Sequence, residues 1–195
     1  MKLLFLDTET TGLDPDKNAV IQIAGVVEIN GEVKEEFNFK CKPLEDDEVE
    51  LQALDVQKLT VEELELYPES KPVYEQFSKM LDSYVDRYNK ADKFYMVGQN
   101  TKFDYDFLNS WFKKHGDRFL YSRINYHLID IMQMSAMFKL AGLMEIPNLK
   151  LETIAKYFKI PLDAHKAEND VKATREVFHK YLTSVKDLKI KVEAL

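Results

Sequence analysis

Acidic side chains recur at separated points of this 195-residue chain, in settings where they could act together. Asp7 and Glu9 stand at the end of the short apolar run Lys2–Thr8, which predicts a buried strand. Alternate residues of a strand point to one face, so the two carboxylates can converge. Adjacent carboxylates repel each other, and a hard divalent cation is the usual relief of that repulsion. Taken alone, such a pair is most often a solvated strand end, so a metal site depends on acids elsewhere.

Two later segments carry further chemistry. Asp104 follows the strand expected over Phe94–Val97 and opens a helix, at the strand edge where α/β sheets gather ligands; alone, it is equally a helix N-cap. His165 and Asp170 introduce the last helix. Five helical positions turn through roughly 140°, so the two reach one site only if His165 lies in the loop before that helix. Alone, such a histidine is usually a surface or capping residue.

Together the segments form a pattern. Asp7-x-Glu9, Asn100-x-x-Phe103-Asp104 and His165-x-Ala167-x-x-Asp170 occur in the order and spacing of the DEDDh (DnaQ-like) 3′–5′ exonucleases, which the chain resembles from residue 3 to about residue 182. That family includes the proofreading exonuclease subunit of bacterial DNA polymerase III, RNase T and oligoribonuclease. The flanking stretches 20–24 and 151–155 also agree with it. The resemblance implies an α/β, RNase H-like fold: a five-stranded mixed sheet, its first three strands antiparallel, flanked by helices.

The resemblance also implies roles. Asp7, Glu9, Asp104 and Asp170 match the four metal-site acids, and His165 matches the general base. Two Mg²⁺ or Mn²⁺ ions per site suit these oxygen ligands, whereas zinc is disfavoured without cysteine or further histidine. Two such cations can activate a water and stabilise the leaving 3′ oxygen of an in-line displacement.

Residues beside the acids are expected to contact substrate. The resemblance places Thr8, Thr10 and Thr11 next to the terminal nucleotide, and Asn100 and Phe103 around its pocket. Leu54–Thr60 resembles a family segment whose usual form is Val-His-Gly-Ile/Leu-Thr, with Gln57 in place of the histidine and Lys58 in place of the glycine. Gln57 can still hydrogen-bond a sugar or phosphate.

The elements that must position these residues can be predicted from patterning. Asn30-Gly31 between the apolar runs Ala19–Ile29 and Val33–Cys41 is a strong hairpin signal. Thr60–Glu63 has the form of a capping box and predicts a short helix. The remaining elements are a helix after Pro72, a strand over Phe94–Val97, a helix through Phe103–Phe112 ending by Gly116, a strand within Ile124–Ile131, and helices at 132–143, 149–158 and 167–185.

Aromatic residues are dense between Phe103 and Tyr126. Helical spacing assigns Phe103, Phe107 and Trp111 to the core, whereas Tyr105, Tyr121 and Tyr126 are better candidates for stacking on single-stranded bases. Asp130 is expected to have a strand-end role rather than to act as a fifth site acid. We predict one exonuclease domain over residues 1–185 and a tail over 186–195, which docks on its own domain or on a partner.

Composition narrows the setting. A single cysteine, Cys41, excludes a disulfide framework and suits a reducing cytoplasm, and no apolar stretch approaches the 18 residues of a membrane span. Net charge is −7, with 22 acidic against 11 basic residues in 1–96 and 12 against 16 in 97–195. The mildly basic second half could face a polyanion; acid-rich helices lying early in the chain would explain the same difference.

We therefore expect a metal-dependent 3′–5′ exonuclease that releases nucleoside 5′-monophosphates from single-stranded 3′ ends, DNA preferred over RNA. An exoribonuclease that trims RNA 3′ ends, and an inactive module that binds nucleic-acid ends beside a polymerase, are the alternatives. The chain has no room for a polymerase domain, so a role in replication proofreading would need a DNA polymerase in trans.

Overall fold

A five-stranded sheet runs through the centre of the computed structural model, which describes residues 1–163 and 166–187. Its strands are β1 (Lys2–Thr10), β2 (Val20–Ile29), β3 (Glu32–Lys40), β4 (Tyr95–Gly98) and β5 (Ile129–Asp130). The helices are α1 (Leu51–Gln57), α2 (Val61–Leu64), α3 (Ser70–Tyr84), α4 (Thr101–Lys114), the 3₁₀ turn η1 (Leu120–Ser122), α5 (Ile131–Leu140), α6 (Leu151–Tyr157) and α7 (Ala167–Asp187). Within the described ranges, no helix is long and apolar enough to cross a membrane.

The strand order is β3-β2-β1-β4-β5, with β1, β2 and β3 antiparallel and β4 and β5 parallel to β1. The predicted hairpin joins β2 to β3: Asn30 and Gly31 have φ of 54° and 87°, the positive angles that such a turn needs. Parallel pairing brings the ends of β1 and β4 to one edge of the sheet. The predicted mixed sheet with three antiparallel leading strands is confirmed.

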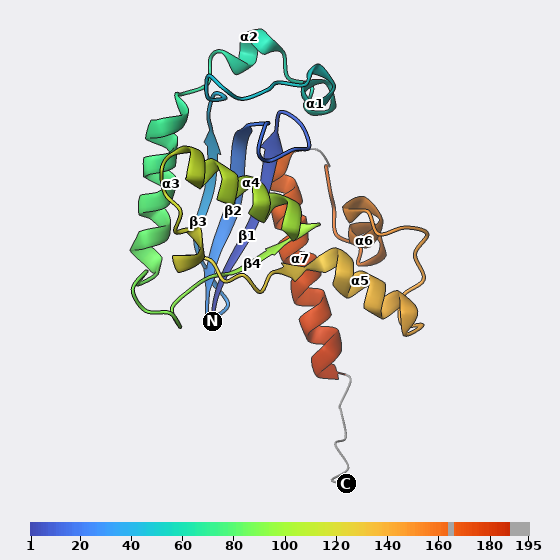
Figure 1. Cartoon of the computed structure of the whole chain (residues 1–195). Helices are drawn as coiled ribbons and strands as arrows, with labels where there is room; N and C mark the ends of the chain where they lie inside the picture. Colours follow the sequence, from blue (N-terminus) through green and yellow to red (C-terminus); the bar gives the residue numbers. More distant parts are fainter. Residues whose placement is uncertain (164–165, 188–195) are drawn as a thin grey trace.

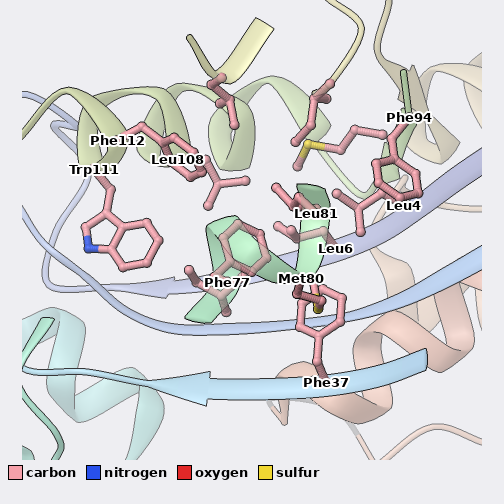
Figure 2. Packing of buried hydrophobic residues seen from close by; sticks show 14 of the residues in the cluster. Leu4, Leu6, Phe37, Phe77, Met80, Leu81, Phe94, Leu108, Trp111 and Phe112 are labelled. Carbon is pink, nitrogen blue, oxygen red and sulfur yellow. The ribbon is translucent and has the colours of Figure 1, made fainter. Parts of the chain in front are cut away.

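Helices cover both faces of the sheet. In Figure 1, α3 and α4 lie on one face, α7 with α5 and α6 on the other, and α1 and α2 stand beyond the end of the sheet where β1 ends. Because side chains alternate along a strand, β1 feeds two cores: Leu4 and Leu6 pack toward α3 and α4, whereas Leu3 and Phe5 pack toward α7. Figure 2 shows the first core, where Phe77 and Trp111 meet the sheet. Phe107 and Trp111 are buried there as predicted.

Local signals explain several boundaries and miss others. The capping box at Thr60 is present in both directions, since Glu63 N donates to Thr60 Oγ1 and Thr60 N donates to the Glu63 carboxylate. The helix α1 was not predicted, because seven residues are too few for a periodic signal. The strand expected within Ile124–Ile131 is only two residues long, because the chain bends out of the sheet at Tyr126 and His127.

Candidate active site

The four predicted acids come from three elements that end or begin at one edge of the sheet. Asp7 and Glu9 occupy alternate positions of β1, Asp104 lies in the first turn of α4, and Asp170 lies in the first turn of α7. A bulge between Glu9 and Thr10 breaks the regular pairing of β1 with β2 immediately after the acids. Bulges of this kind re-aim side chains and are common beside active sites. The fold thus brings together acids that are up to 163 positions apart in the sequence.

Asp104 joins α4 to β1 and does not cap the helix. The N-cap of α4 is Asn100, in the left-handed conformation (φ 59°), four residues before Asp104. Asp104 is 3% exposed, and its Oδ1 accepts hydrogen bonds from Thr8 N at 2.9 Å and Thr8 Oγ1 at 2.8 Å. The cap interpretation that the sequence left open is therefore wrong, and the carboxylate faces the acids of β1.

The electrostatics of these acids show that they act on one another. Burial raises the pKa of Asp7 well above its usual range, and Asp104, Glu9 and Asp170 raise it further. Burial and the charge of Asp170 raise the pKa of Glu9 to about 7. Burial also raises the pKa of Asp104 to about 7, although the two hydrogen bonds from Thr8 favour its charged form. Buried carboxylates that raise one another's pKa are typical of functional sites.

The donor set suits a hard divalent cation. Carboxylate oxygens are the preferred ligands of Mg²⁺ and Mn²⁺, and a cation would relieve the repulsion that raises these pKa values. Among the described residues, no three His, Cys, Asp or Glu side chains form a group that could hold a metal ion as they stand. The role of the four acids as ligands stays a prediction.

The threonines predicted to contact substrate already use their hydroxyls within the chain. Thr10 Oγ1 donates to the carbonyl oxygen of Gly12 at 2.7 Å, and Thr11 Oγ1 donates to that of Glu48 at 2.6 Å. Thr8 is committed to Asp104, as described above. Thr10 and Thr11 therefore hold the loop after β1 in place beside Asp7 and Glu9, and Thr8 holds Asp104.

The other predicted contact residues line or support the same edge. Gln57 Nε2 donates to the Thr10 carbonyl oxygen at 2.8 Å, which ties α1 to the end of β1. Phe103 is half-buried, with its ring 4.7 Å from that of Phe107. Asp130 accepts from Asn100 N at 3.1 Å and from Met132 N at 2.9 Å, so it caps α5 and supports the start of α4, in keeping with the strand-end role expected.

His165 and the end of the predicted tail, residues 188–195, lie outside the described residues. The base assigned to His165 and the docking of the tail therefore remain predictions. Two positions after His165, Ala167 is 2% exposed at the start of α7, where a small side chain lets the helix approach the sheet.

Asn18 is a residue of this region that the sequence did not single out. It is buried, accepts from Asp14 N at 2.9 Å and donates to the Glu48 carbonyl oxygen at 3.1 Å. A Cβ on Gly12 would meet the Asn18 side chain at 2.4 Å, so glycine is required there. In the sequence, Gly12 alone indicates that another side chain comes this close to the backbone.

A groove of ≈ 540 Å³ opens beside Glu9, between the α1–α2 segment and the start of α7. Its lining includes Glu9, Gln57 and Tyr67, three lysines (Lys40, Lys58 and Lys166) and two further acids (Glu63 and Glu168). Lys40 stands over the Tyr67 ring, 5.1 Å from its centroid. The groove thus places cations and an aromatic face next to the acidic edge, by which we mean the end of the sheet that carries Asp7, Glu9, Asp104 and Asp170.

Comparisons with known proteins agree with this geometry. The model of the family described as "Exonuclease" (RNase_T) matches residues 4–178. The chain is 25% identical to the PolC-type DNA polymerase III of Thermotoga petrophila over 95% of its own length, and 28% identical to that of Lacticaseibacillus paracasei over 86%. It spans only 12% and 10% of those polymerases.

Solved structures share the fold. Exonuclease I of E. coli in a zinc-bound complex with single-stranded DNA has a TM-score of 0.76 at 20% identity, covering 96% of this chain and 41% of that one. Its complex with a dT13 oligonucleotide has a TM-score of 0.75 at 20% identity, covering 97% and 42%.

Proposed function

The chain belongs to the DnaQ-like family of 3′–5′ exonucleases, and on that premise we propose that it hydrolyses the terminal phosphodiester bond at the 3′ end of single-stranded DNA. The products would be nucleoside 5′-monophosphates, and two Mg²⁺ or Mn²⁺ ions would serve one site. The observation that carries the proposal is the gathering of Asp7, Glu9, Asp104 and Asp170 into a group of mutually repelling carboxylates.

The chain's own residues divide the task of holding cations. As the family resemblance implies, Asp7 would help to hold the cations, and the charges of the other three acids all act on its carboxylate. Glu9 and Asp170, which act on each other, complete the first position, and Asp104 serves the second. Bound divalent ions supply Lewis acidity, which lowers the pKa of a water and stabilises the leaving 3′ oxygen. Thr8 orients Asp104 for this role.

His165 takes the proton of the attacking water in this proposal. An imidazole near its free pKa of about 6.5 is partly unprotonated at neutral pH. We expect His165→Ala to retain metal binding and to lose about 10²–10⁴ in rate, with partial recovery at high pH where hydroxide replaces the base. A collapse of metal affinity in this variant would instead make His165 a ligand.

The nucleic acid would enter across the acidic edge. Residues Thr8–Thr11, Gln57, Asn100 and Phe103 surround this edge and would contact the terminal nucleotide through backbone groups, the Gln57 amide or the Phe103 ring. The groove beside Glu9 offers Lys40, Lys58 and Lys166 as partners for phosphate. We propose DNA rather than RNA because the two relatives named above are DNA polymerases and the two exonuclease I structures named above are complexes with single-stranded DNA or an oligothymidylate.

A DNA polymerase is the proposed partner. The curated relatives carry the matching region inside a polymerase chain, of which this chain spans about 12%. Proofreading or repair beside a polymerase is the corresponding role, and the reducing cytoplasm that Cys41 suits is the compartment that we propose for it.

Digestion of matched labelled oligonucleotides tests the proposal. DNA and RNA of one sequence, labelled at either end, are incubated with Mg²⁺, with Mn²⁺ or with chelator. We expect stepwise shortening from the 3′ end of DNA that stops with chelator. Faster shortening of RNA would make the chain an exoribonuclease, and retention of both oligonucleotides without cleavage would make it a binding module.

A further inference from the structure

The segment Ile124–Asp130 forms the outer edge of the sheet, on the side of β4 away from β1. It pairs with β4 at both ends, where Phe94 bridges to Ile124 and Val97 pairs with Ile129. Between these points the chain leaves the ladder in a bend, closed by a hydrogen bond that His127 N donates to Asn125 Oδ1 at 3.0 Å. The bend interrupts the predicted strand and carries Tyr126 and His127.

The bend exposes a pair of flat rings. Tyr126 is 70% exposed, and its ring centroid lies 4.0 Å from that of His127, which is also exposed. A second ring pair lies earlier in the chain, at the start of η1, where Phe119 and Tyr121 are half exposed with centroids 6.0 Å apart. Exposed aromatic faces in series are the feature on which single-stranded bases stack, whatever their sequence.

The charge of the segment suits a polyanion. No Asp or Glu occurs from Arg118 to Ile129, in a chain whose net charge is −7. Arg118 is exposed at the start of this stretch, and the Lys93 ammonium stands over the Tyr121 ring, 5.6 Å from its centroid. Cations beside exposed rings would attract phosphates while the rings hold the bases.

The bend is continuous with the acidic edge. Asp130, at the end of the segment, accepts a hydrogen bond from Asn100 N, the N-cap of the helix that carries Asp104. Tyr126 precedes Asp130 by four positions, which is at most about 13 Å of extended chain. When the 3′ end of a nucleic-acid strand lies at the four acids, the rest of that strand extends away in the 5′ direction. The Tyr126–His127 bend is within reach of this 5′ part.

We propose that the Tyr126–His127 bend is a stacking platform for single-stranded nucleic acid, which holds bases on the 5′ side of the bond to be cleaved. The inference rests on the proposed function, because it takes the 3′ end to lie at the four acids. Tyr121 with Lys93 extends the platform for longer strands. The platform would give long single strands an affinity that short ones lack.

Fluorescence anisotropy measures this length advantage. The probes are 5′-labelled oligothymidylates of about 3 and about 12 nucleotides, the longer within the span that stacking grooves bind. Binding is measured with Mg²⁺ in the Asp7→Asn background, so that no probe is consumed. Tyr126→Ala is compared with Tyr126→Phe, which keeps the ring, and with Tyr88→Ala, which removes a tyrosine that is 88% exposed on the loop between α3 and β4.

We expect Tyr126→Ala to weaken binding of the long probe about tenfold or more, the usual loss for one stacked base, and Tyr126→Phe to restore it. Tyr88→Ala should bind both probes as the parent does. An unchanged affinity of Tyr126→Ala for the long probe, or an equal loss in Tyr88→Ala, would overturn the platform. Hydrolysis by the otherwise unaltered chain is measured separately, so failure of the proposed function and failure of the platform give different results.

Discussion

Helix α7 contributes to two carboxylate environments, one around Glu28 and one around Asp7, which differ in how the negative charge is balanced. Toward the far end of the sheet, Glu28 of β2 is 2% exposed and accepts hydrogen bonds from Arg175 Nε at 2.7 Å and His179 Nε2 at 2.9 Å. At the other end, Asp170 stands in the first turn of the same helix, and among the described residues the charges acting on Asp7 are those of Asp104, Glu9 and Asp170.

The difference fits our proposal, in which Glu28 is a structural carboxylate and the acid group holds cations. A buried charge is tolerated when it is paired, and Glu28 is paired by two side chains of α7. In the acid group, Asp104 accepts hydrogen bonds from the uncharged Thr8, and the pKa values of Asp7, Glu9 and Asp104 are raised. Keeping like charges together opposes folding, and the divalent cations that we propose for this site would offset that cost.

The largest expected effect breaks the acid group. Asp7→Asn keeps the shape of the side chain and removes the charge that both cations would share. We expect hydrolysis of a labelled single-stranded oligonucleotide to fall by more than the roughly 10²–10³ that the loss of one stabilising hydrogen-bond donor costs.

Glu28→Gln is the matched control, because it removes the single negative charge of the paired carboxylate and does not alter the acid group. Its turnover should stay within a few-fold of that of the parent. Activity of Asp7→Asn within tenfold of the parent would contradict the assignment of Asp7.

The second largest effect is expected on stability, when the pairing of Glu28 is broken. Arg175→Met leaves Glu28 buried with His179 alone, and we expect a loss of about 3 kcal/mol in the free energy of unfolding. This is the lower end of the range for a buried pair, because the Arg175 side chain is 27% exposed.

Lys172→Met on the same helix removes the exposed ion pair with Glu36 and should cost no more than about 1 kcal/mol. Urea unfolding of the two variants gives the comparison. Equal losses would mean that burial of Glu28 does not set the energy of its pairing.

The third effect concerns pH in the presence of chelator. The pKa of Glu9 is about 7 in the folded chain against an ordinary value of 4.5, so the native state holds this proton more tightly than the unfolded state. Stability contributed by this group is therefore complete below about pH 4.5 and is lost as the pH rises through about 7.

Glu9→Gln removes this titration. The melting midpoint of the parent, relative to that of Glu9→Gln, should fall by several degrees between pH 5 and pH 8, and the fall should shrink when Mn²⁺ competes with the proton. A difference between the two proteins that is independent of pH would count against repulsion within the group.

Local signals in the sequence predicted much of this arrangement. The turn at Asn30-Gly31 needs positive φ angles, which these two residue types adopt readily. Thr60 and Glu63 cap the start of α2 by bonding to each other's backbone. Both signals are local and do not depend on distant residues. The resemblance supplied the acids. It did not supply the bond from Thr8 to Asp104, which joins positions 96 residues apart, nor the use of the Thr11 hydroxyl on Glu48, because tertiary packing decides those partners.

The segment that ends in β5 shows a second limit of prediction from sequence. The sequence predicts a strand within Ile124–Ile131, but Phe94 and Val97 pair with Ile124 and Ile129 only, and the residues between these two bend outward. Pattern alone cannot locate such a break, because Tyr126 suits a strand as well as a surface bend. The region that the sequence described least well is therefore the one from which the platform is inferred.

The response of the melting midpoint to metal tests most directly that the four acids share divalent cations. Cation bound only by the native state adds roughly 2.7 kcal/mol at a hundred times its dissociation constant, and each kcal/mol moves the midpoint of a domain of this size by about 2–4 °C. Millimolar Mn²⁺ in place of chelator should thus raise the midpoint of the parent by several degrees, and that of Lys172→Met equally. Asp170→Ala should show a clearly smaller rise. The same metal-induced rise in the parent and in Asp170→Ala would contradict the account.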